Sequence, residues 1–514
     1  MGLDPQGEGL SESSAADVRT VAKGGAVQIA GQIASRGLGY LFLAVSVRIL
    51  GTAGYGLYRQ VTQILNIAGG LAPGGFNYAA VRYIAKARAQ KEHGGVKGAI
   101  WIALAGGTIC SGLAFGIVFL GAGAIASSFA DSPAKQDFAA FLLRLGAAYV
   151  PLYAIQQVLR FATQAYKTMV PAVIIANVIQ PGVRFILGAA LLLAGFTLAG
   201  VMASLVASAA ISVVAAALYL RRMMNDKERN ASPIFETSSM TRFALPQAGV
   251  HLFSVHVLGL GIVLLGILSG DVQVGLFGIA LSLQSPGRVF LTGIVQIWAP
   301  VVTDLYESGH IARLNSLYQT INRWVATFSF PFFAALIVLP EPFVRILSGD
   351  ERAASLAAIL AVGNFFFTGT GPCSYVLSMT GRPGLNLVNS IVAMALYAGL
   401  GVWLVPQYGA AGMAIVDSLV SALINVARVV EVKLLVGVQP YGRSYAKPVA
   451  ATLLLTLVLM VWRLLPGDGY ALEVAGLAVG TAAYLGALWG MGLDAEERHV
   501  FERIRSRLFK AGKR

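Results

Sequence analysis

Long apolar stretches recur along the whole chain and constrain its fold more than any other feature. Each is about 20 residues or longer, enough for a helix to cross a ~30 Å hydrocarbon core. Only 12% of the residues are charged, about half of what a soluble protein carries. We therefore expect an all-α polytopic membrane protein. Fourteen transmembrane spans fit the sequence, at roughly 22–47, 57–81, 99–126, 139–162, 170–194, 198–220, 243–268, 274–298, 320–340, 354–378, 384–404, 409–430, 447–465 and 470–491.

The distribution of basic residues predicts how these spans are oriented. The net charge is +14. If both termini are cytoplasmic, most Lys and Arg residues lie in the cytoplasmic segments outside the spans. This asymmetry follows the positive-inside rule. It explains the basic segments at 82–97, 221–242 and 498–514 without a nucleic-acid partner. We expect a multi-pass protein of the inner, cytoplasmic membrane with both termini inside.

Two stretches in the first half of the chain align with two in the second half. GTAGYGLYRQVTQI (51–64) aligns with GDVQVGLFGIALSL (270–283), and LAGVMASLV (198–206) aligns with GAAGMAIVD (409–417). Six spans bring the chain back to the side on which it started, so both halves keep the same orientation. The sequence therefore predicts two parallel repeats of six helices, followed by two further C-terminal helices.

The polar stretch at 221–242 places the boundary between the two predicted lobes. The last residues alternate between an apolar and a basic face, which indicates an amphipathic helix that binds anionic membrane lipids. The predicted organisation is a disordered cytoplasmic tail at 1–18, a first lobe at 19–230, a second lobe at 231–435, two spans at 436–493 and a basic amphipathic cytoplasmic tail at 494–514.

Polar residues form stripes at helical spacing inside several spans. Such groups face a bundle interior or an aqueous cavity, because lipid does not solvate them. For the amides, interhelical hydrogen bonding is the structural alternative. The candidate cavity residues are Gln32 and Arg36 in the first span, Arg59, Gln63 and Asn66 in the second, Gln180 and Arg184 in the fifth, and Gln284 and Arg288 in the eighth.

The arginines of the first lobe lack an obvious counter-charge. No Asp or Glu occurs within the first six spans, so these guanidinium groups suit a ligand that brings its own negative charge. Arginine binds phosphate through two parallel hydrogen bonds, which favours it over lysine at such sites. The pattern predicts a water-filled cavity that binds an anion.

Asp417 is the one acidic residue clearly inside a span. It is a candidate for Na⁺ or proton coupling, and a structural partnership with neighbouring polar residues is the alternative. Cys110 and Cys373 lie far apart and show no metal-ligand spacing, so we expect no metal and no cofactor. No GxxxxGK[ST] loop for a nucleotide occurs. We do not expect an enzyme.

Several motifs resemble a known group of transporters. ILGTAGYGLYRQ and GGFNYAAVRYIAK in the first half, and GLFGIA, WAPVVTDLYESG, LSMTGRP and LVPQYGAAGMAIVDS in the second, resemble in order those of polysaccharide exporters and oligosaccharide-lipid flippases. These belong to the multidrug/oligosaccharidyl-lipid/polysaccharide (MOP) flippase superfamily. The resemblance implies a V-shaped pair of six-helix lobes and alternating access. It also implies transfer of an undecaprenyl-diphosphate-linked glycan to the outer leaflet for cell-surface polysaccharide biosynthesis.

The resemblance also bears on site residues, partners and alternatives. Related flippases for the lipid-linked peptidoglycan precursor place cavity arginines on helices 1, 2 and 8, and Arg36, Arg59 and Arg288 match by helix. Polysaccharide polymerase and export machinery are implied partners. A multidrug or cation antiporter of the same superfamily is one alternative, although cations favour acidic cavities. A peptidoglycan-precursor flippase is another. A membrane glycosyltransferase would need paired carboxylates.

Overall fold

Glycines with positive φ divide the two longest helices of the computed structural model, which describes residues 6–166, 168–465 and 469–492. α1 (Gln6–Leu71) breaks at Gly51, where φ is 68° and ψ is 172°. α18 (Pro383–Val436) breaks at Gly409, where φ is 57° and ψ is −132°. Glycine adopts such angles without a steric penalty from Cβ. Each of these helices therefore contains two spans joined by a sharp corner.

The chain folds into two compact units. Unit 1 comprises the described residues of Met1–Ser282, Ile346–Leu356 and Leu387–Asp417. Its helices are α1, α2 (Phe76–Ala89), α3 (His93–Leu120), α4 (Ala122–Ser127), α5 (Pro133–Ala147), α6 (Tyr149–Gln164), α7 (Val170–Val173), the π-helix η1 (Ile174–Ile179), α8 (Gln180–Leu193), α9 (Leu198–Met223), α10 (Asp226–Asn230), α11 (Thr237–Ser269), nearly all of α12 (Asp271–Leu283) and part of α18.

Unit 2 comprises the described residues of Leu283–Arg345, Ala357–Asn386 and Ser418–Arg514. It contains α13 (Ser285–Glu307), α14 (Ile311–Val338), most of α15 (Glu341–Leu347) and of α16 (Ala353–Gly369), α17 (Cys373–Met379), the end of α18, the 3₁₀ helix η2 (Arg443–Tyr445), α19 (Ala446–Arg463) and α20 (Tyr470–Gly490). The predicted domain boundaries stay predictions, and the predicted tail at 494–514 lies outside the described residues.

The helices confirm the predicted fold class. Nine helices among the described residues are long and apolar enough to cross a membrane, or up to eleven if each of two bent pairs is one span. α1 and α18 each hold two spans, and the 33-residue α11 adds another. The fourteen predicted spans are therefore accommodated, and the described residues contain no strand.

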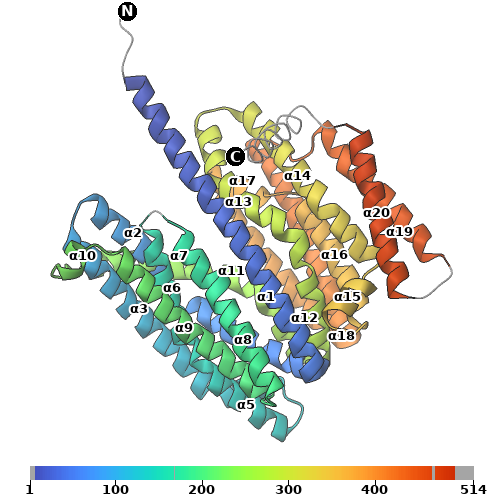
Figure 1. The fold of residues 1–514 in the computed structure, drawn as a ribbon, viewed down its shortest axis with the longest axis horizontal. Helices are drawn as coiled ribbons and strands as arrows, with labels where there is room; N and C mark the ends of the chain where they lie inside the picture. Colours follow the sequence, from blue (N-terminus) through green and yellow to red (C-terminus); the bar gives the residue numbers. More distant parts are fainter. Residues whose placement is uncertain (1–5, 167, 466–468, 493–514) are drawn as a thin grey trace, which may run out of the picture. The chain divides into compact units, whose positions relative to one another are not determined.

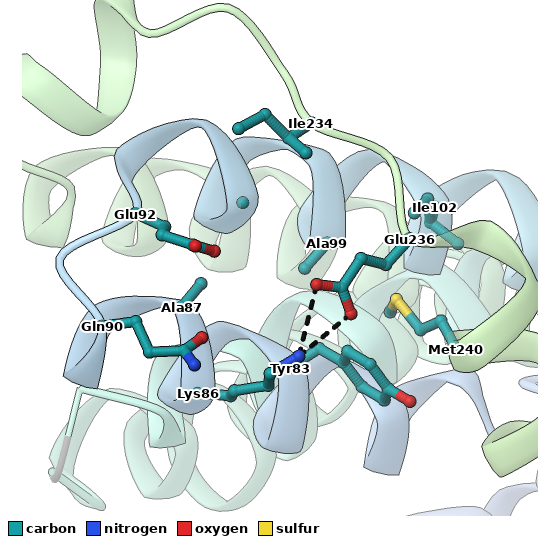
Figure 2. A pocket seen from close by; sticks show the side chains of 11 residues that line it. Tyr83, Lys86, Ala87, Gln90, Glu92, Ala99, Ile102, Ile234, Glu236 and Met240 are labelled. Atoms are coloured by element: carbon teal, nitrogen blue, oxygen red, sulfur yellow. Dashed lines mark hydrogen bonds and ion pairs between the residues drawn. The ribbon is translucent and has the colours of Figure 1, made fainter.

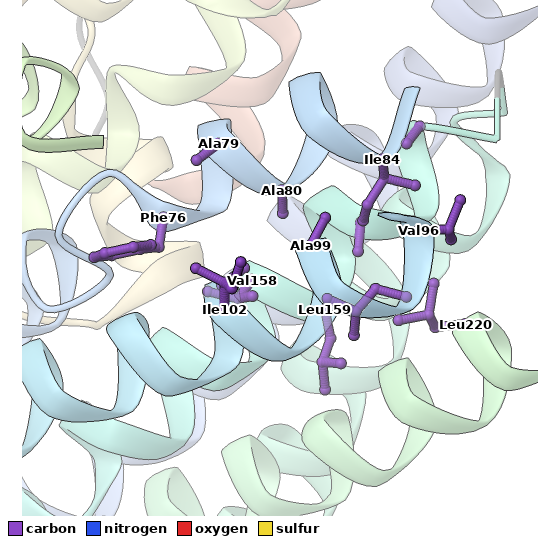
Figure 3. Packing of buried hydrophobic residues seen from close by; sticks show 14 of the residues in the cluster. Phe76, Ala79, Ala80, Ile84, Val96, Ala99, Ile102, Val158, Leu159 and Leu220 are labelled. Carbon is purple, nitrogen blue, oxygen red and sulfur yellow. The ribbon is translucent and has the colours of Figure 1, made fainter. Parts of the chain in front are cut away.

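Small side chains dominate the core of unit 1, where α2, α3, α6, α9 and α11 meet (Figure 3). Phe76 packs there against Gly106 of α3, because a Cβ at Gly106 would lie 2.4 Å from Phe76 Cζ. Helices in lipid associate through such close packing, since apolar burial between them gains little. In Figure 1, α3, α6, α9 and α8 of this unit lie side by side.

In unit 2, α14, α19 and α20 share an apolar core. Figure 1 shows α19 and α20 side by side. Two ion pairs fix one end of this group. Arg345 Nη1 lies 3.1 Å from Glu473 Oε2, and Arg463 Nη2 lies 3.0 Å from Glu341 Oε1. The two C-terminal helices are therefore attached to unit 2 by both packing and charge.

The segment between α9 and α11, residues 225–236, is docked on unit 1, and we call it the strap. Asn225 Oδ1 accepts a hydrogen bond from Glu228 N at 2.7 Å, and Glu228 Oε2 accepts one from Asn225 N at 3.1 Å, which caps α10. Glu228 is only 2% exposed. Its carboxylate also accepts from Arg88 Nε and from the Tyr166 hydroxyl, each at 3.1 Å. The predicted inter-lobe boundary is thus an ordered element.

The end of the strap lies along α3. Ile234 N donates to Gly94 O at 2.9 Å, and Gly94 lets the two backbones approach because a Cβ there would lie 2.5 Å from Ser232 O. Figure 2 shows Lys86 reaching Glu236 Oε2, 3.2 Å away, across a small pocket. Charged residues of both signs and apolar residues line the pocket. We interpret it as part of the structural contact between the strap and the neighbouring helices.

Candidate functional site

Two of the predicted arginines lie near the same tyrosine in unit 1. Arg59 lies on the second segment of α1 and Arg184 on α8, and Tyr55 is near both guanidinium groups. The Nε atoms of both arginines are buried and have no hydrogen-bond partner. Within the part of the chain that the structure describes, neither arginine forms an ion pair with a carboxylate. We call Phe42, Tyr55, Tyr58, Arg59 and Arg184 the arginine cluster.

Aromatic rings hold the arginine cluster in place without neutralising it. The guanidinium carbon of Arg184 lies 5.2 Å from the centre of the Phe42 ring and 5.6 Å from that of Tyr58. Each such cation–π contact contributes about 0.5–2 kcal/mol. Arg59 lies across Gly278 of α12, where a Cβ would be 3.3 Å from Arg59 Nε. The cluster therefore combines two guanidinium groups with aromatic neighbours.

Two further polar residues extend this site along the first segment of α1. Arg36 and Gln32 are half-buried on α1, one turn apart on the same face. One turn beyond Arg36, the Tyr40 hydroxyl donates to Ser282 O at 3.0 Å. This hydrogen bond ties the first segment of α1 to α12.

The predicted amides of unit 1 contact neighbouring helices. Asn66 is exposed, and its Oδ1 accepts from the Tyr149 hydroxyl at 3.3 Å. Gln63 lies against Gly259 of α11, where a Cβ would be 1.9 Å from Gln63 Nε2. These contacts show that at least part of the polar stripe joins helices, as the structural alternative requires.

Gln180 occupies a distinctive place on α8. Its Oε1 accepts a hydrogen bond from Gln156 Nε2 of α6 at 3.0 Å. The π-helix η1 directly precedes it, and Pro181 follows. A π-helical turn shifts the register of the side chains that come after it and is frequent at functional sites. The irregular turn therefore sets the direction in which Gln180 and Arg184 project.

The predicted pair Gln284 and Arg288 lies in unit 2 and has amide partners. Arg288 Nε donates to Asn364 Oδ1, and Asn364 Nδ2 donates to Gln284 Oε1 at 3.3 Å. Gln284, which is 1% exposed, also donates to Ala357 O at 3.1 Å. The guanidinium carbon of Arg288 lies 5.4 Å from the centre of the Phe367 ring. Arg288 is held by a neutral amide and an aromatic ring, much as Arg184 is held by rings.

The acidic candidate Asp417 accepts a hydrogen bond in unit 1. The Tyr397 hydroxyl donates to Asp417 Oδ1 at 3.0 Å. The same hydroxyl packs on α11, since a Cβ at Gly261 would lie 2.4 Å from it. The two roles predicted for Asp417, ion coupling and a structural partnership, stay predictions. A hydrogen bond from a tyrosine is compatible with either role.

The residues missed by sequence reasoning are mainly those that orient the arginines. Phe42, Tyr55, Tyr58, Asn364 and Phe367 were not among the candidates, because only polar and charged stripes were followed. A signal for two of them was present. Tyr55, Tyr58 and Arg59 follow the i, i+3, i+4 spacing of one helix face. A search for aromatic residues directly before, or one turn before, each arginine would have found them.

Comparisons with known families place the chain. A family model described as "Polysaccharide biosynthesis protein" matches residues 21–306, more than half of the chain. A second, described as MatE, matches residues 246–403. No curated protein sequence matches the chain.

Solved structures with the same fold are transporters. "Lipid II flippase MurJ, inward closed conformation" is similar with a TM-score of 0.73 and 13% identity, covering 89% of this chain and 98% of that one. An inward-facing multidrug resistance MATE family transporter of the MOP superfamily has a TM-score of 0.64 and 15% identity, covering 80% and 98%. A MOP superfamily transporter from Pyrococcus furiosus has a TM-score of 0.57 and 15% identity, covering 82% and 96%.

Proposed function

The chain belongs to the family of polysaccharide biosynthesis proteins and has the fold of MOP superfamily transporters, and on this basis we propose that it flips a polyprenyl-diphosphate-linked oligosaccharide. The lipid moves from the cytoplasmic to the outer leaflet of the inner membrane, for synthesis of a cell-surface polysaccharide. Both termini of the flippase are cytoplasmic. Polymerase and export proteins act on the lipid after it has crossed.

The single observation that carries the proposal is the arginine cluster. Arg59 and Arg184 present two positive charges, with buried Nε donors that lack partners. A diphosphate that joins a polyprenol to a sugar carries two negative charges at neutral pH. Its oxygens accept paired hydrogen bonds from guanidinium groups. Charge and donor geometry therefore suit this head group better than a neutral or cationic substrate.

The mechanism requires binding and movement, with no bond made or broken in the substrate. The diphosphate lies at the arginine cluster, and the other predicted residues of unit 1 (Gln32, Arg36, Gln63, Asn66 and Gln180) line the path of the polar head. Gln284 and Arg288 of unit 2 stay candidate substrate-binding residues. The polyprenyl tail stays in lipid, because its transfer to a polar interior is unfavourable. Alternating access then exposes the head on the other side. Since the protein only moves its substrate, we do not propose an enzyme.

We further propose that Asp417 couples transport to a Na⁺ or proton gradient. A carboxylate that binds or releases a cation changes its charge. The Tyr397 hydroxyl, 3.0 Å away, donates a hydrogen bond to the anionic form. Such a change in charge alters how the surrounding helices pack. The role of Asp417 is separable from head-group binding, since it does not belong to the arginine cluster.

A second candidate substrate is the lipid-linked peptidoglycan precursor. The similarity of fold to the structure titled Lipid II flippase MurJ favours this candidate, and its diphosphate would use the same arginines. Export of cationic drugs is disfavoured, because the arginine cluster would repel a cation. The family match favours the polysaccharide precursor over both.

A transport assay tests the proposal. The protein is reconstituted in vesicles with a fluorescent polyprenyl-diphosphate disaccharide, and access of the sugar from the opposite leaflet is timed. Wild type should accelerate crossing, and Arg59→Ala and Arg184→Ala should lower the rate at least tenfold, since each removes a charged hydrogen bond of about 1.5–3 kcal/mol. Arg144→Ala is the matched control, because Arg144 is exposed on α5. Equal rates for all variants, or exchange of an organic cation instead, would exclude the proposed flippase.

A further inference from the structure

A buried amide without hydrogen-bond partners lies between the second segment of α1 and α11. Gln60, on α1, is only 1% exposed. Within the described part of the chain, neither its Nε2 nor its Oε1 atom has a hydrogen-bond partner. Gln60 is not one of the predicted cavity residues and does not belong to the arginine cluster. Burial of an amide without a partner raises the free energy of the arrangement that buries it.

The side chain of Gln60 fills a space that a glycine of α11 leaves open. A Cβ on Gly266 would overlap the side-chain amide of Gln60, so this amide lies directly against the backbone of α11. One turn farther along α1, the side chain of Gln63 lies in the same way against Gly259. Two glutamine–glycine contacts thus join α1 to α11. We call Gln60, Gln63, Gly259 and Gly266 the glutamine seam.

The second half of the chain has an aliphatic residue at the position equivalent to Gln60. Gln60 lies nine residues after Gly51, the corner glycine of α1. Ile279 lies nine residues after Gly270, the counterpart of Gly51 between α11 and α12. Ile279 is 0% exposed, so both positions are fully buried. An aliphatic side chain is therefore compatible with this place on the helix, and packing alone does not explain the amide.

The glutamine seam joins helices of the two predicted repeats, which alternating access moves relative to each other. α1 belongs to the first repeat and α11 begins the second, and both lie in unit 1. While the seam is closed, the amide of Gln60 is buried and makes no hydrogen bond. When α11 moves away from α1, water reaches the amide and satisfies its two donors and its acceptor. Opening this seam therefore costs less than opening an entirely apolar one.

We propose that Gln60 destabilises the closed glutamine seam and thereby sets how often α11 separates from α1 during transport. Gln60 is a positioning residue, because it acts through the pair of helices and does not touch the cargo. Gly266 provides the space that the amide needs in the closed arrangement. This inference rests on the proposed alternating-access transport, and it names a residue that balances two arrangements of the protein.

Replacement of the amide by an apolar group of similar shape tests the proposal. Gln60→Met should raise the unfolding temperature in detergent, because it removes the unbonded amide from the closed seam. It should also slow lipid crossing in the vesicle assay about tenfold, because the closed seam then opens less often. Ile279→Met is the matched control, since it exchanges one buried apolar side chain for another at the equivalent position. It should neither raise the unfolding temperature nor slow crossing.

Thiol labelling measures the opening of the seam without a transport assay. Ile262 lies on α11 between Gly259 and Gly266, on the same helix face, and is 2% exposed. With both native cysteines replaced by alanine, a charged methanethiosulfonate reagent reaches the thiol introduced by Ile262→Cys only when the seam opens. Labelling should be about tenfold slower when Gln60→Met is added. Ala103→Cys, in the core of unit 1, should resist labelling with and without Gln60→Met.

The outcomes separate this inference from the function on which it rests. If Gln60→Met lowers the unfolding temperature, the amide stabilises the closed seam, and the inference is wrong. It is also wrong if the Ile262→Cys thiol is labelled equally fast with and without Gln60→Met, even when the protein proves to be a flippase. If wild type moves no lipid, the proposed function fails, while labelling and unfolding still decide the role of Gln60.

Discussion

Gly56 and Gly275 occupy equivalent positions in the two halves of the chain, and each packs against the backbone of the other's helix. A Cβ at Gly56 would lie 1.8 Å from Asp271 O, and a Cβ at Gly275 would lie 2.2 Å from Thr52 O. Thr52 and Asp271 are themselves equivalent in the aligned stretches at 51–64 and 270–283. A contact that maps onto itself when the halves are exchanged is isologous, as at a two-fold axis. The repeat is therefore visible in three dimensions.

We expect Gly56→Ala to destabilise the protein. The added methyl group meets a backbone carbonyl, which cannot rotate away, so the helices must separate at a cost of about 1–3 kcal/mol. Thermal unfolding in detergent measures the effect. Gly37→Ala is the control, since nothing lies within 4 Å of a Cβ there and alanine favours a helix. Equal stability of the two variants would contradict the close crossing.

Replacement of Glu228 should release the strap. Glu228→Ala removes one of the two capping-box hydrogen bonds of α10, the one from Asn225 N, and leaves Arg88 and Tyr166 without their shared acceptor, so we expect a loss of about 2–4 kcal/mol in the free energy of unfolding. Trypsin should then cut the strap at Lys227 or Arg229 faster than in wild type. In the control Glu236→Ala, an exposed ion pair is lost, and the change should stay below about 1 kcal/mol. A resistant Glu228→Ala strap would show that α3 packing alone holds it.

Asp350 gives a pH-dependent contact outside the spans. Hydrogen bonds from Arg352, and one from the Thr52 hydroxyl at 2.5 Å, lower the pKa of Asp350 to about 2, below the value of about 3.9 in an unfolded chain. A lowered pKa stabilises the folded state above pH ~4 and loses that effect as the pH falls toward 2.

The difference in unfolding temperature between wild type and Asp350→Asn measures this contribution. We expect the difference to be constant from pH 7 to about 4 and to shrink between pH 4 and 2. The control is Asp226→Asn, because the Asp226 side chain is 91% exposed. A difference that persists unchanged at pH 2 would mean that the Asp350 charge does not stabilise the fold.

Arg184→Lys should impair transport although it keeps the charge. A lysine ammonium lacks the planar guanidinium that lies beside the Phe42 and Tyr58 rings, and it cannot form two parallel bonds to a phosphate. We expect a loss of about tenfold in the rate at which the lipid crosses, measured in the vesicle assay. Arg144→Lys, at an exposed position, should transport normally. Full activity of Arg184→Lys would show that charge alone suffices at the arginine cluster.

Asp417→Asn should separate binding from coupling. If Asp417 couples transport to an ion gradient, the variant should still bind the lipid but lose its response to an imposed Na⁺ or pH gradient. Tyr397→Phe removes the hydrogen bond and keeps the carboxylate, so it should retain a weakened response. Gradient dependence of crossing is the measurement. A response that is unchanged in Asp417→Asn would assign Asp417 a structural role.

The fold was predictable because a bilayer leaves few choices. Span length, positive-inside asymmetry and internal alignment all depend on the order of residues along the chain. The corner at Gly51 and its counterpart at Gly270, where φ is 90° and ψ is 174°, fall at the first position of the two aligned stretches. Here local sequence and local geometry coincide.

The site was less predictable, because its geometry depends on contacts between distant residues. The spacing of Arg59 and Arg184 within their own helices does not reveal that Tyr55 lies near both guanidinium groups. Nor does sequence distinguish Gln284, which is buried against Ala357 O, from an amide that faces a cavity.

The docked strap determines where the chain can be divided into two separately expressed fragments. A co-expression experiment with two half-proteins would naturally cut the polar stretch between α9 and α11, as if it were a spacer. Yet Glu228 and Ile234 complete the surface of the preceding helices. A fragment that ends before residue 225 would lose the contacts of the strap with Arg88 and with Gly94 of α3. The amino-terminal fragment should therefore extend through Glu236, and the carboxy-terminal fragment should start at α11.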